Sequence, residues 1–399
     1  MAQRRGGTVA TARRMPNRGR IDEELIELAL AGAGWQAIVE RLAATTGDEV
    51  RLIGVHGGCL ASSPVPGAAG MTSAAVAAVA RDAPPQTVTC LDGWTALASA
   101  VTAGPRGVGV LALAGPPSVL TEELFAAARH AIGIEAVRRD AQAQARSESA
   151  ARLIDEVRYG VLGDPREVAR MAGRFGLRLD RPHTAVAFHY EGDNQHTWQT
   201  ALSWVENPIR HDHHTGWTIL PDDAAERTRI RIRLQGMVGN DAQVLVAVGS
   251  TVEHPADTTR SFFDAEVTLA VLRRRGEGGE LRFEDLGALG LLFSIPRERL
   301  ARFVEQRLGP VIDRADLLDT LAAWYETNGS RAAVAARLHL HRNSVGHRLA
   351  RVGELIGIDP LDIGTAFDVQ SALAARDVLA ILDELSSENR GQPVNPRTD

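Results

Sequence analysis

The stretch from Asn328 to Gly353 constrains the fold of this chain more than any other part of the sequence. Ser330 is a favourable helix N-cap, and the Ala-rich segment 331–338 that follows it predicts a short helix. Three residues then separate this segment from a second helix, which is predicted to begin near Arg342. His339 takes the exposed turn position, where a positive φ is often needed and His is tolerated better than most residues. Two short helices joined by so tight a turn are typical of a helix-turn-helix motif.

The predicted second helix has an apolar back and a polar front. The apolar stripe repeats at helical spacing and consists of Val345, Leu349, Val352 and Ile356. The candidate DNA-binding residues lie on the opposite face and its flanks, and are Arg342, Asn343, Ser344, His347, Arg348 and Arg351. Asn343 can pair both its amide groups with an adenine edge, whereas the flanking arginines are better placed for phosphates. Arg348 has a structural alternative, a salt bridge to Glu354 or Glu326.

The charge of this stretch differs from that of the whole chain. Between Thr327 and Gly353 there are five arginines and no Asp or Glu, although the chain as a whole has a net charge of −6. Phosphate contact is the simplest reason for a cationic patch on an acidic protein. The alternative is an ordinary helical hairpin with Arg on its solvated face. The absence of Lys fits a GC-rich codon bias, so the choice of Arg over Lys carries little functional meaning.

Length and composition limit the remaining possibilities. A chain of 399 residues is too long for one ordinary core, so two or three domains are expected. No apolar run is long enough to cross a membrane, and no apolar segment follows the N-terminal arginines as it would in a secretory signal. Cys59 and Cys90, the only cysteines, suit a reducing compartment. The sequence therefore predicts a cytoplasmic protein without membrane association, and no motif indicates a cofactor.

The order of the predicted elements indicates a multidomain α+β chain. An α+β sensory domain is expected first, then a helical linker, a second α+β domain and an all-α DNA-binding domain. The predicted boundaries are a disordered arm at 1–20, the sensory domain at 21–140, the linker at 141–163, the second α+β domain at 164–295, the helical domain at 297–386 and a disordered tail at 387–399. No Gly or Pro lies between Gly133 and Gly160, so residues 121–159 predict either one long helical stalk or two helices with a loop.

Two parts of the second α+β domain have patterns that predict particular elements. Asp164 followed by Pro165 and Glu167 predicts a helix start. Residues 229–234 alternate Arg with Ile or Leu, and residues 243–248 form an apolar strand pattern. We expect these two segments to form a strand pair joined around 237–241.

The C-terminal motifs resemble a known family. The segments 317–321, 328–329, 335–345 and 347–349 together resemble the C-terminal DNA-binding domain of PucR/CdaR-type bacterial transcriptional regulators. The family usually has Tyr where this chain has His347. More weakly, residues 244–287 resemble the degenerate GGDEF-like domain of these regulators, and residues 21–145 resemble their GAF-like sensory domain. The resemblance implies a DNA-binding transcriptional regulator whose partners are double-stranded DNA and an unknown small-molecule effector. A homodimer or higher homo-oligomer is expected, because operators are usually read by symmetric pairs.

The sequence supports an enzymatic function less well than a DNA-binding one. A diguanylate cyclase needs acidic residues that hold metal beside a Gly-Gly loop, and the 237–241 segment lacks that series. His211, His213 and His214, with His189 and His196 nearby, could form a metal site, but no Cys accompanies them and residues 208–215 are expected to be a solvated loop. We therefore predict neither catalytic residues nor a metal site. The alternative function is a nucleotide-binding or diguanylate-cyclase-like signalling protein with a C-terminal interaction module.

Overall fold

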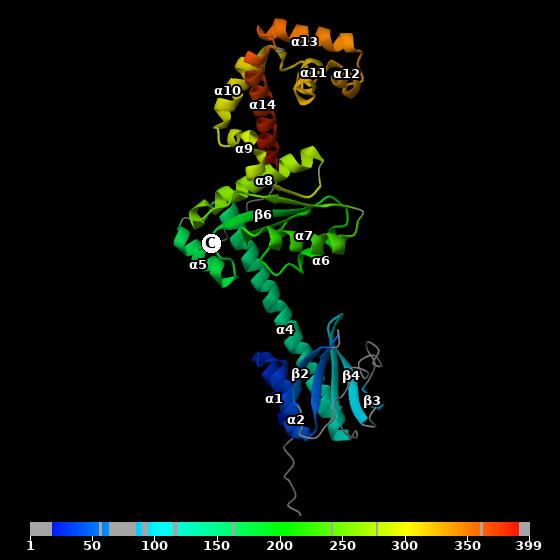
Figure 1. Cartoon of the computed structure of the whole chain (residues 1–399). Helices are drawn as coiled ribbons and strands as arrows, with labels where there is room; N and C mark the ends of the chain where they lie inside the picture. Colours follow the sequence, from blue (N-terminus) through cyan, green and yellow to red (C-terminus); the bar gives the residue numbers. More distant parts are fainter. Residues whose placement is uncertain are drawn as a thin grey trace, which may run out of the picture. The chain divides into compact units, whose positions relative to one another are not determined.

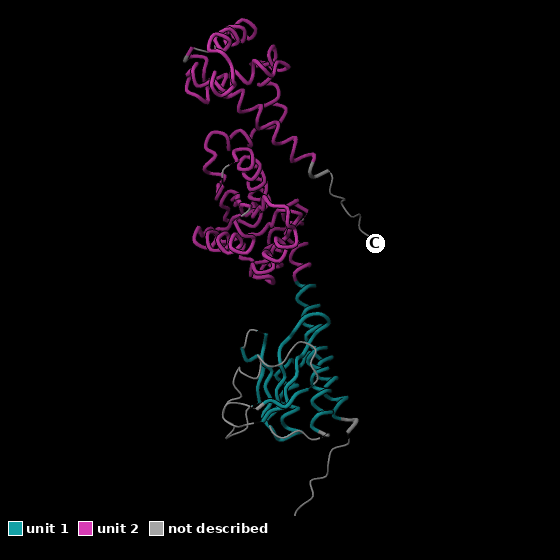
Figure 2. The backbone as a smooth tube through the Cα atoms, turned by 90° about the vertical axis from the view of Figure 1, so that its right-hand side faces the viewer, with its two compact units in different colours: residues 1–146 teal, residues 147–399 magenta. Residues whose placement is uncertain are grey.

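The computed structural model describes residues 18–55, 58–63, 85–89, 95–114, 119–161, 164–240, 242–276, 278–359 and 362–390. The chain divides into two compact units, residues 1–146 and 147–399 (Figure 2). Each unit has its own sheet and its own core, so each is described by itself. Most of the predicted arm, Cys90, Asp241, Leu361 and the tail beyond residue 390 lie outside the described residues.

Unit 1 begins with two helices that cover an antiparallel sheet. Helices α1 (Arg18–Leu30) and α2 (Gly34–Thr46) are separated at Gly32 and Gly34, whose φ angles of 74° and 89° favour glycine. The predicted break between two helices is confirmed. The sheet has the order β2-β1-β5-β4-β3, with β1 at Val50–Gly54, β2 at Cys59–Ser63, β3 at Gln86–Thr89, β4 at Thr95–Ala103 and β5 at Arg106–Ala114.

The core of unit 1 lies on one face of this sheet. Leu97, Val101 and Leu111 point into it and pack with Phe125 and Ile132 of the following helix. The opposite face carries a second cluster of small buried residues from β4 and β5, which are Ala96, Ala98, Val110, Ala112 and Ala114. Because side chains alternate between the faces of a strand, the two clusters follow directly from the alternation in the sequence.

Helix α4 is one continuous helix of 40 residues, Val119–Arg158 (Figure 1). At 1.5 Å per residue it is about 60 Å long. The predicted single stalk is therefore confirmed over the alternative of two helices and a loop. Residues 141–149 of this helix are exposed, whereas Leu153, Ile154 and Val157 enter the core of unit 2.

Unit 2 opens with an α+β sandwich around a second sheet. Asp164 caps α5 (Pro165–Arg174) by accepting a hydrogen bond from the Arg166 amide, which confirms the predicted helix start. The sheet has the order β10-β9-β6-β8-β7, and all its pairs are antiparallel except β10 with β9. Its strands are β6 (His183–Tyr190), β7 (Arg210–His211), β8 (Thr215–Pro221), β9 (Val244–Val248) and β10 (Glu280–Arg282). Helices α6 (Gln195–Leu202) and α7 (Ala224–Val238) cover one face, and α5 with α8 (Thr258–Arg275) cover the other.

The prediction of a strand at residues 229–234 is wrong. These residues lie inside helix α7, which begins after Asp223, whose side chain accepts hydrogen bonds from the amides of Ala225 and Glu226. The Asp223 cap and a run free of Gly and Pro from 222 to 235 favour a helix over the strand that the short alternation predicted. In this helix Leu234 is buried and Ile232 is exposed. The antiparallel hairpin of this domain is instead β7–β8, which turns at residues 212–214.

From Arg297 onward, every regular element in the described part of unit 2 is a helix, as predicted. These helices are α10 (Arg297–Leu308), α11 (Ala315–Glu326), α12 (Arg331–Arg337), α13 (Arg342–Ile356) and α14 (Ile363–Arg390). The short helix α9 (Ala288–Leu292) precedes them. Helix α14 extends past residue 386, where the tail was expected to begin. One core joins these helices to α8, because Val267 and Val271 pack in the same cluster as Leu321 and Val345.

Candidate nucleic-acid interface

Two capped helices form the candidate interface. The Ser330 hydroxyl accepts a hydrogen bond from the Ala333 amide at 3.3 Å and so begins α12. His339 lies in the turn with a φ of 53°, which confirms the predicted left-handed position. The Nδ1 atom of His341 accepts from the Asn343 amide at 3.3 Å and caps α13. This histidine cap was not anticipated, because His is not among the usual capping residues.

The predicted apolar back of α13 is confirmed. Val345, Leu349 and Val352 are buried, and they pack in one cluster with Leu321 of α11 and Val334 of α12. A helix whose back is locked in this way presents its opposite face at a fixed angle. The helix-turn-helix geometry therefore follows from the spacing of a few apolar residues.

The front of α13 faces solvent. Arg342, Asn343, His347 and Arg351 are exposed, and Ser344 is half-buried. Within the described part of the chain, neither the side-chain carboxamide of Asn343 nor the Arg342 guanidinium has a hydrogen-bond partner. Arg351 forms a salt bridge of 2.7 Å with Glu354, one turn further along the same helix. The structure thus brings five of the six predicted residues onto one solvent-facing side of the helix, and Arg348 is the exception.

Arg348 lies differently from the other arginines of this helix. Its guanidinium donates to the backbone oxygen of Asp316 at 3.2 Å and to the Thr320 hydroxyl at 3.4 Å, and its Nε lies 3.7 Å from the Asp316 carboxylate. These contacts tie α13 to α11. A brace was the alternative considered from the sequence, but both expected partners are engaged elsewhere: Glu354 with Arg351, and Glu326 with Arg337 at 2.6 Å. The true partners are 28 and 32 residues away, and no local pattern identifies them.

The histidines of the second domain do not gather into a metal site. No group of three or more potential metal ligands occurs among the residues that the structure describes. His189 is buried, and its Nδ1 lies 2.8 Å from the Thr215 hydroxyl. Burial, helped by the charge of Arg273, lowers the pKa of His189 from 6.5 to about 4. This imidazole is therefore neutral at physiological pH.

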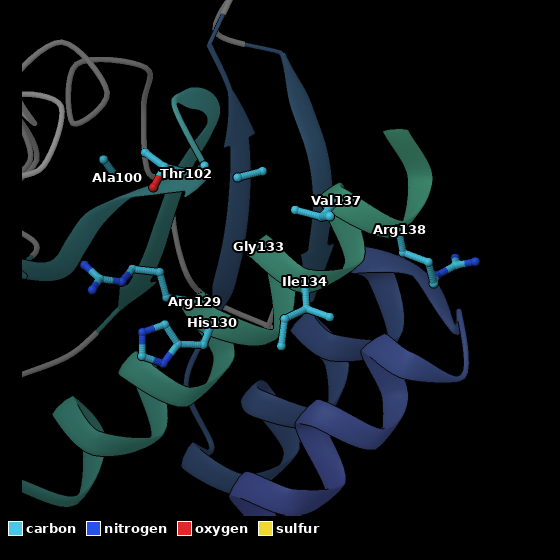
Figure 3. A pocket seen from close by; sticks show the side chains of 10 residues that line it. Ala100, Thr102, Arg129, His130, Gly133, Ile134, Val137 and Arg138 are labelled. Carbon is cyan, nitrogen blue, oxygen red and sulfur yellow. The ribbon is translucent and has the colours of Figure 1, made fainter. Parts of the chain in front are cut away.

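Unit 1 contains a cavity of about 700 Å³ between strand β4 and helix α4 (Figure 3). Arg129, His130, Ile134 and Val137 line it from the helix. Thr102 lies opposite, at the end of the strand. The Arg129 guanidinium donates to the Ser99 hydroxyl at 2.8 Å. The helix wall of the cavity thus combines the apolar Ile134 and Val137 with the basic Arg129, His130 and Arg138, a combination able to hold a small organic molecule.

Comparison with known proteins defines two domain classes in this chain. The family model of the PucR C-terminal helix-turn-helix domain matches residues 317–375, and that of the GGDEF-like domain matches residues 159–271. The first match covers α11 to α13 and enters α14, so the predicted motif is a helix-turn-helix domain. The predicted resemblance to PucR/CdaR-type regulators is confirmed over these two segments, and the multidomain α+β fold class is confirmed with it.

Two individual proteins are similar to this chain. The carbohydrate diacid regulator of Escherichia coli (strain K12) is 31% identical over 118 residues, which are 29% of this chain and 31% of that relative. The match thus spans about a third of the relative's length. The crystal structure of a regulator of polyketide synthase expression from Bifidobacterium adolescentis aligns with 57% of this chain and 97% of its own, at 17% identity and a TM-score of 0.27. None of the described helices is both long and apolar enough to cross a lipid bilayer.

Proposed function

We propose that this protein is a sequence-specific DNA-binding transcriptional regulator that acts in the cytoplasm. The observation that carries the proposal is the coincidence of two independent features. Residues 317–375 match the PucR helix-turn-helix model, and within them the exposed face of α13 presents Arg342 and Asn343 without internal partners in the described structure. The relative with a 31% identical segment is a regulator by its name.

Each residue of the exposed face has a separate part in the proposal. Asn343, near the N-terminus of α13, reads a base edge through its two amide groups. Arg342 is adjacent and contacts phosphate, and Arg351 reaches phosphate after leaving its exposed salt bridge, which costs little. Ser344 and His347 complete the face. Arg348 positions the helix through α11 instead of contacting DNA directly.

The second domain has no catalytic part in this proposal. The hairpin of its sheet turns through His211, Asp212, His213, His214 and Thr215, which contain neither the glycine pair nor the acidic pair of a cyclase loop. Purified protein incubated with GTP and Mg²⁺ is therefore expected to release no cyclic dinucleotide. Detection of that product by mass spectrometry would revive the alternative of a signalling enzyme.

A direct test of DNA binding uses the full chain and a pool of randomised duplexes. Repeated selection should enrich a defined sequence, with palindromic half-sites if the protein binds as a dimer. The control chain carries Arg342→Ala and Asn343→Ala, two exposed positions whose replacement leaves the core intact. Enrichment of the same sequence by both chains, or of none by the wild type, would reject the proposal.

Effector binding and self-association are further parts of the proposal. Unit 1 is the sensory part, and the cavity between β4 and α4 is its candidate ligand site. A homodimer or higher homo-oligomer is supported by the middle of α4, where residues 141–149 are all exposed. Light scattering at micromolar concentration should give at least twice the chain mass, and a monomeric mass would contradict it.

A further inference from the structure

A second cavity, of about 970 Å³, lies inside unit 2. Five segments contribute to its wall: the end of helix α4, the end of strand β6, the β7–β8 turn with the start of β8, the last turns of helix α8, and the C-terminal half of helix α14. The residues from these segments include His189, Thr215, Leu269, Arg273 and Leu385. The cavity therefore lies where the GGDEF-like sheet meets the helix that continues into the DNA-binding domain.

Most charged groups of the wall neutralise one another. Arg158 lies over the ring of Trp217 at 3.9 Å and donates to Glu266 at 2.5 Å. Arg274 on α8 donates to Glu384 on α14 at 2.7 Å.

Two further acids, Asp212 and Glu191, belong to the wall, and neither forms a salt bridge with Arg273 in the described structure. Asp212 accepts hydrogen bonds from the Trp217 indole at 3.2 Å and from the Thr215 amide at 3.1 Å. Glu191 lies on the exposed rim beyond the end of β6. Arg273, by contrast, has no hydrogen bond or salt bridge within the described residues. Arg273 is therefore the arginine of this wall whose guanidinium is available to bind a ligand.

The same cavity wall contains a buried imidazole, and one of its ring nitrogens already has a hydrogen-bond partner. His189 is 8% exposed, and its Nδ1 is held by the Thr215 hydroxyl at 2.8 Å. When Nδ1 accepts that hydroxyl hydrogen, Nε2 carries the proton of the neutral ring and can donate it. Burial, with smaller contributions from the charges of Arg273 and His214, lowers the pKa of this histidine, whereas the Asp212 carboxylate acts in the opposite direction. The ring is therefore neutral at physiological pH and keeps one N–H donor.

We propose that this cavity binds an organic anion, whose carboxylate or phosphate group lies between the Arg273 guanidinium and the His189 imidazole. Guanidinium and imidazole donors form charge-assisted hydrogen bonds with both kinds of oxyanion. Leu269, Ala270 and Leu385 supply an apolar wall for the rest of the molecule. The volume is sufficient for a ligand of ordinary metabolite size.

A ligand in this cavity acts on the DNA-binding domain through helix α14. This extension rests on the proposed function. Helix α14 contributes Glu384 and Leu385 to the wall, and its earlier residues Val369 and Leu373 pack in the core shared with α13. The Arg274–Glu384 pair spans the two helices at the cavity. A ligand that changes the packing of α8 against α14 therefore acts on the helix that supports the recognition helix.

The test measures ligand binding alone, on the full chain. Thermal unfolding is followed with inorganic phosphate, phenyl phosphate, acetate and benzoate at millimolar concentrations, against chloride of equal ionic strength. A ligand at concentration c that binds only the folded chain stabilises it by RT ln(1 + c/Kd), so the melting temperature rises with the ligand concentration. Phosphate arms and carboxylate arms distinguish the two oxyanions, and the aromatic members probe the apolar wall.

Variants on one turn of α8 provide the matched comparison. Arg273→Gln removes the lining cation, whereas Arg275→Gln removes an exposed neighbour that does not line the cavity. Loss of one charge-assisted contact should weaken binding at least roughly tenfold in Arg273→Gln. Arg275→Gln should bind as the wild type does.

Three outcomes would overturn the proposal: no shift with any anion, equal loss in both variants, or full binding by Arg273→Gln. Because the measurement needs no DNA, it separates this site from the proposed regulator function. A chain that binds the anion but no operator would retain the site and reject the function.

Discussion

Helices α7 and α13 are both rich in arginine, but one arginine of each lies in opposite surroundings. In α7, Arg227 is fully buried, and it donates to Asp222 at 3.2 Å and to Glu280 at 3.0 Å. In α13, Arg342 is exposed and has no partner in the described structure. The difference lies in their tertiary surroundings, because the fold brings two acids to Arg227 and pairs none with Arg342. Arginine content alone therefore does not identify a nucleic-acid interface.

The largest effect is expected from removing the buried cation of α7. Arg227→Ala leaves Asp222 and Glu280 without a common partner inside the fold. Breaking a buried ion pair costs about 3–5 kcal/mol, and we expect the lower end because Asp222 also pairs with Arg282 at 3.1 Å. Urea unfolding followed by tryptophan fluorescence measures the change, since Trp198 and Trp217 lie in this domain.

Arg229→Ala is the matched control, two residues along the same helix and exposed. Surface substitutions of this kind usually change the free energy of unfolding by less than about 0.5 kcal/mol. Equal effects of the two substitutions on the free energy of unfolding would show that the buried Arg227 contributes no more to stability than the exposed Arg229. That result would contradict the contrast with α13.

A second effect concerns His189, whose neutral form the fold prefers. Its pKa is lowered from 6.5 to about 4, so between these values the unfolded chain binds more protons than the folded chain. The free energy of unfolding should therefore fall as pH decreases through this window, by up to about 3 kcal/mol from this group. His183, also buried and with a lowered pKa, contributes in the same direction.

His189→Asn isolates the contribution of one ring, because the amide can still reach the Thr215 hydroxyl. Chemical denaturation at pH 6.5, 5.5 and 4.5, in buffers without carboxylate or phosphate, should show a shallower loss for the variant. Curves of equal steepness for variant and wild type would show that His189 is not desolvated in the fold.

The third prediction contrasts two exposed residues of the recognition helix. Asn343→Ala should cost about 1–3 kcal/mol of binding free energy on the selected sequence and little on random DNA. Arg342→Ala should weaken both alike and reduce the slope of log affinity against log salt by about 1. Fluorescence anisotropy on both duplexes measures these quantities, and thermal melts check the fold. If Asn343→Ala keeps its melting point and its sequence preference, Asn343 does not read a base.

The sequence predicts the parts of this protein that depend on local spacing. The cap at Ser330, the turn at His339 and the apolar stripe of α13 are all encoded within 30 residues, and all are found. The strand predicted at 229–234 failed because six alternating residues cannot outweigh a capped helix that surrounds them. Residues that act across long separations, such as Asp316 with Arg348 or Arg227 with Glu280, leave no periodic signal.

The boundary between the last two domains also depends on long-range packing that local sequence patterns do not show. Helix α8 places Phe262 and Leu269 in the core of the GGDEF-like sheet and Val267 and Val271 in the core of the C-terminal helices. The predicted second domain, residues 164–295, contains the whole of this helix, because no local pattern shows that one helix packs in two cores. The predicted boundary near residue 295 therefore does not separate two cores. The GAF-like assignment of unit 1 stays a prediction.

The smallest effect concerns Arg348, which combines features of both arginine-rich helices. It lies on the recognition helix, but its side chain is 30% exposed and bound to Asp316 and Thr320 of α11. Arg348→Ala removes these two hydrogen bonds, and we expect a loss of about 1 kcal/mol in the free energy of unfolding. The salt dependence of DNA binding should stay as in the wild type, unlike that of Arg342→Ala. Arg351→Ala, whose exposed pair with Glu354 is worth about 0.3–0.5 kcal/mol, serves as the control for stability. An Arg348→Ala protein with unchanged stability and a salt slope reduced by about 1 would instead make Arg348 a phosphate contact, as its position on the flank of the helix first indicated.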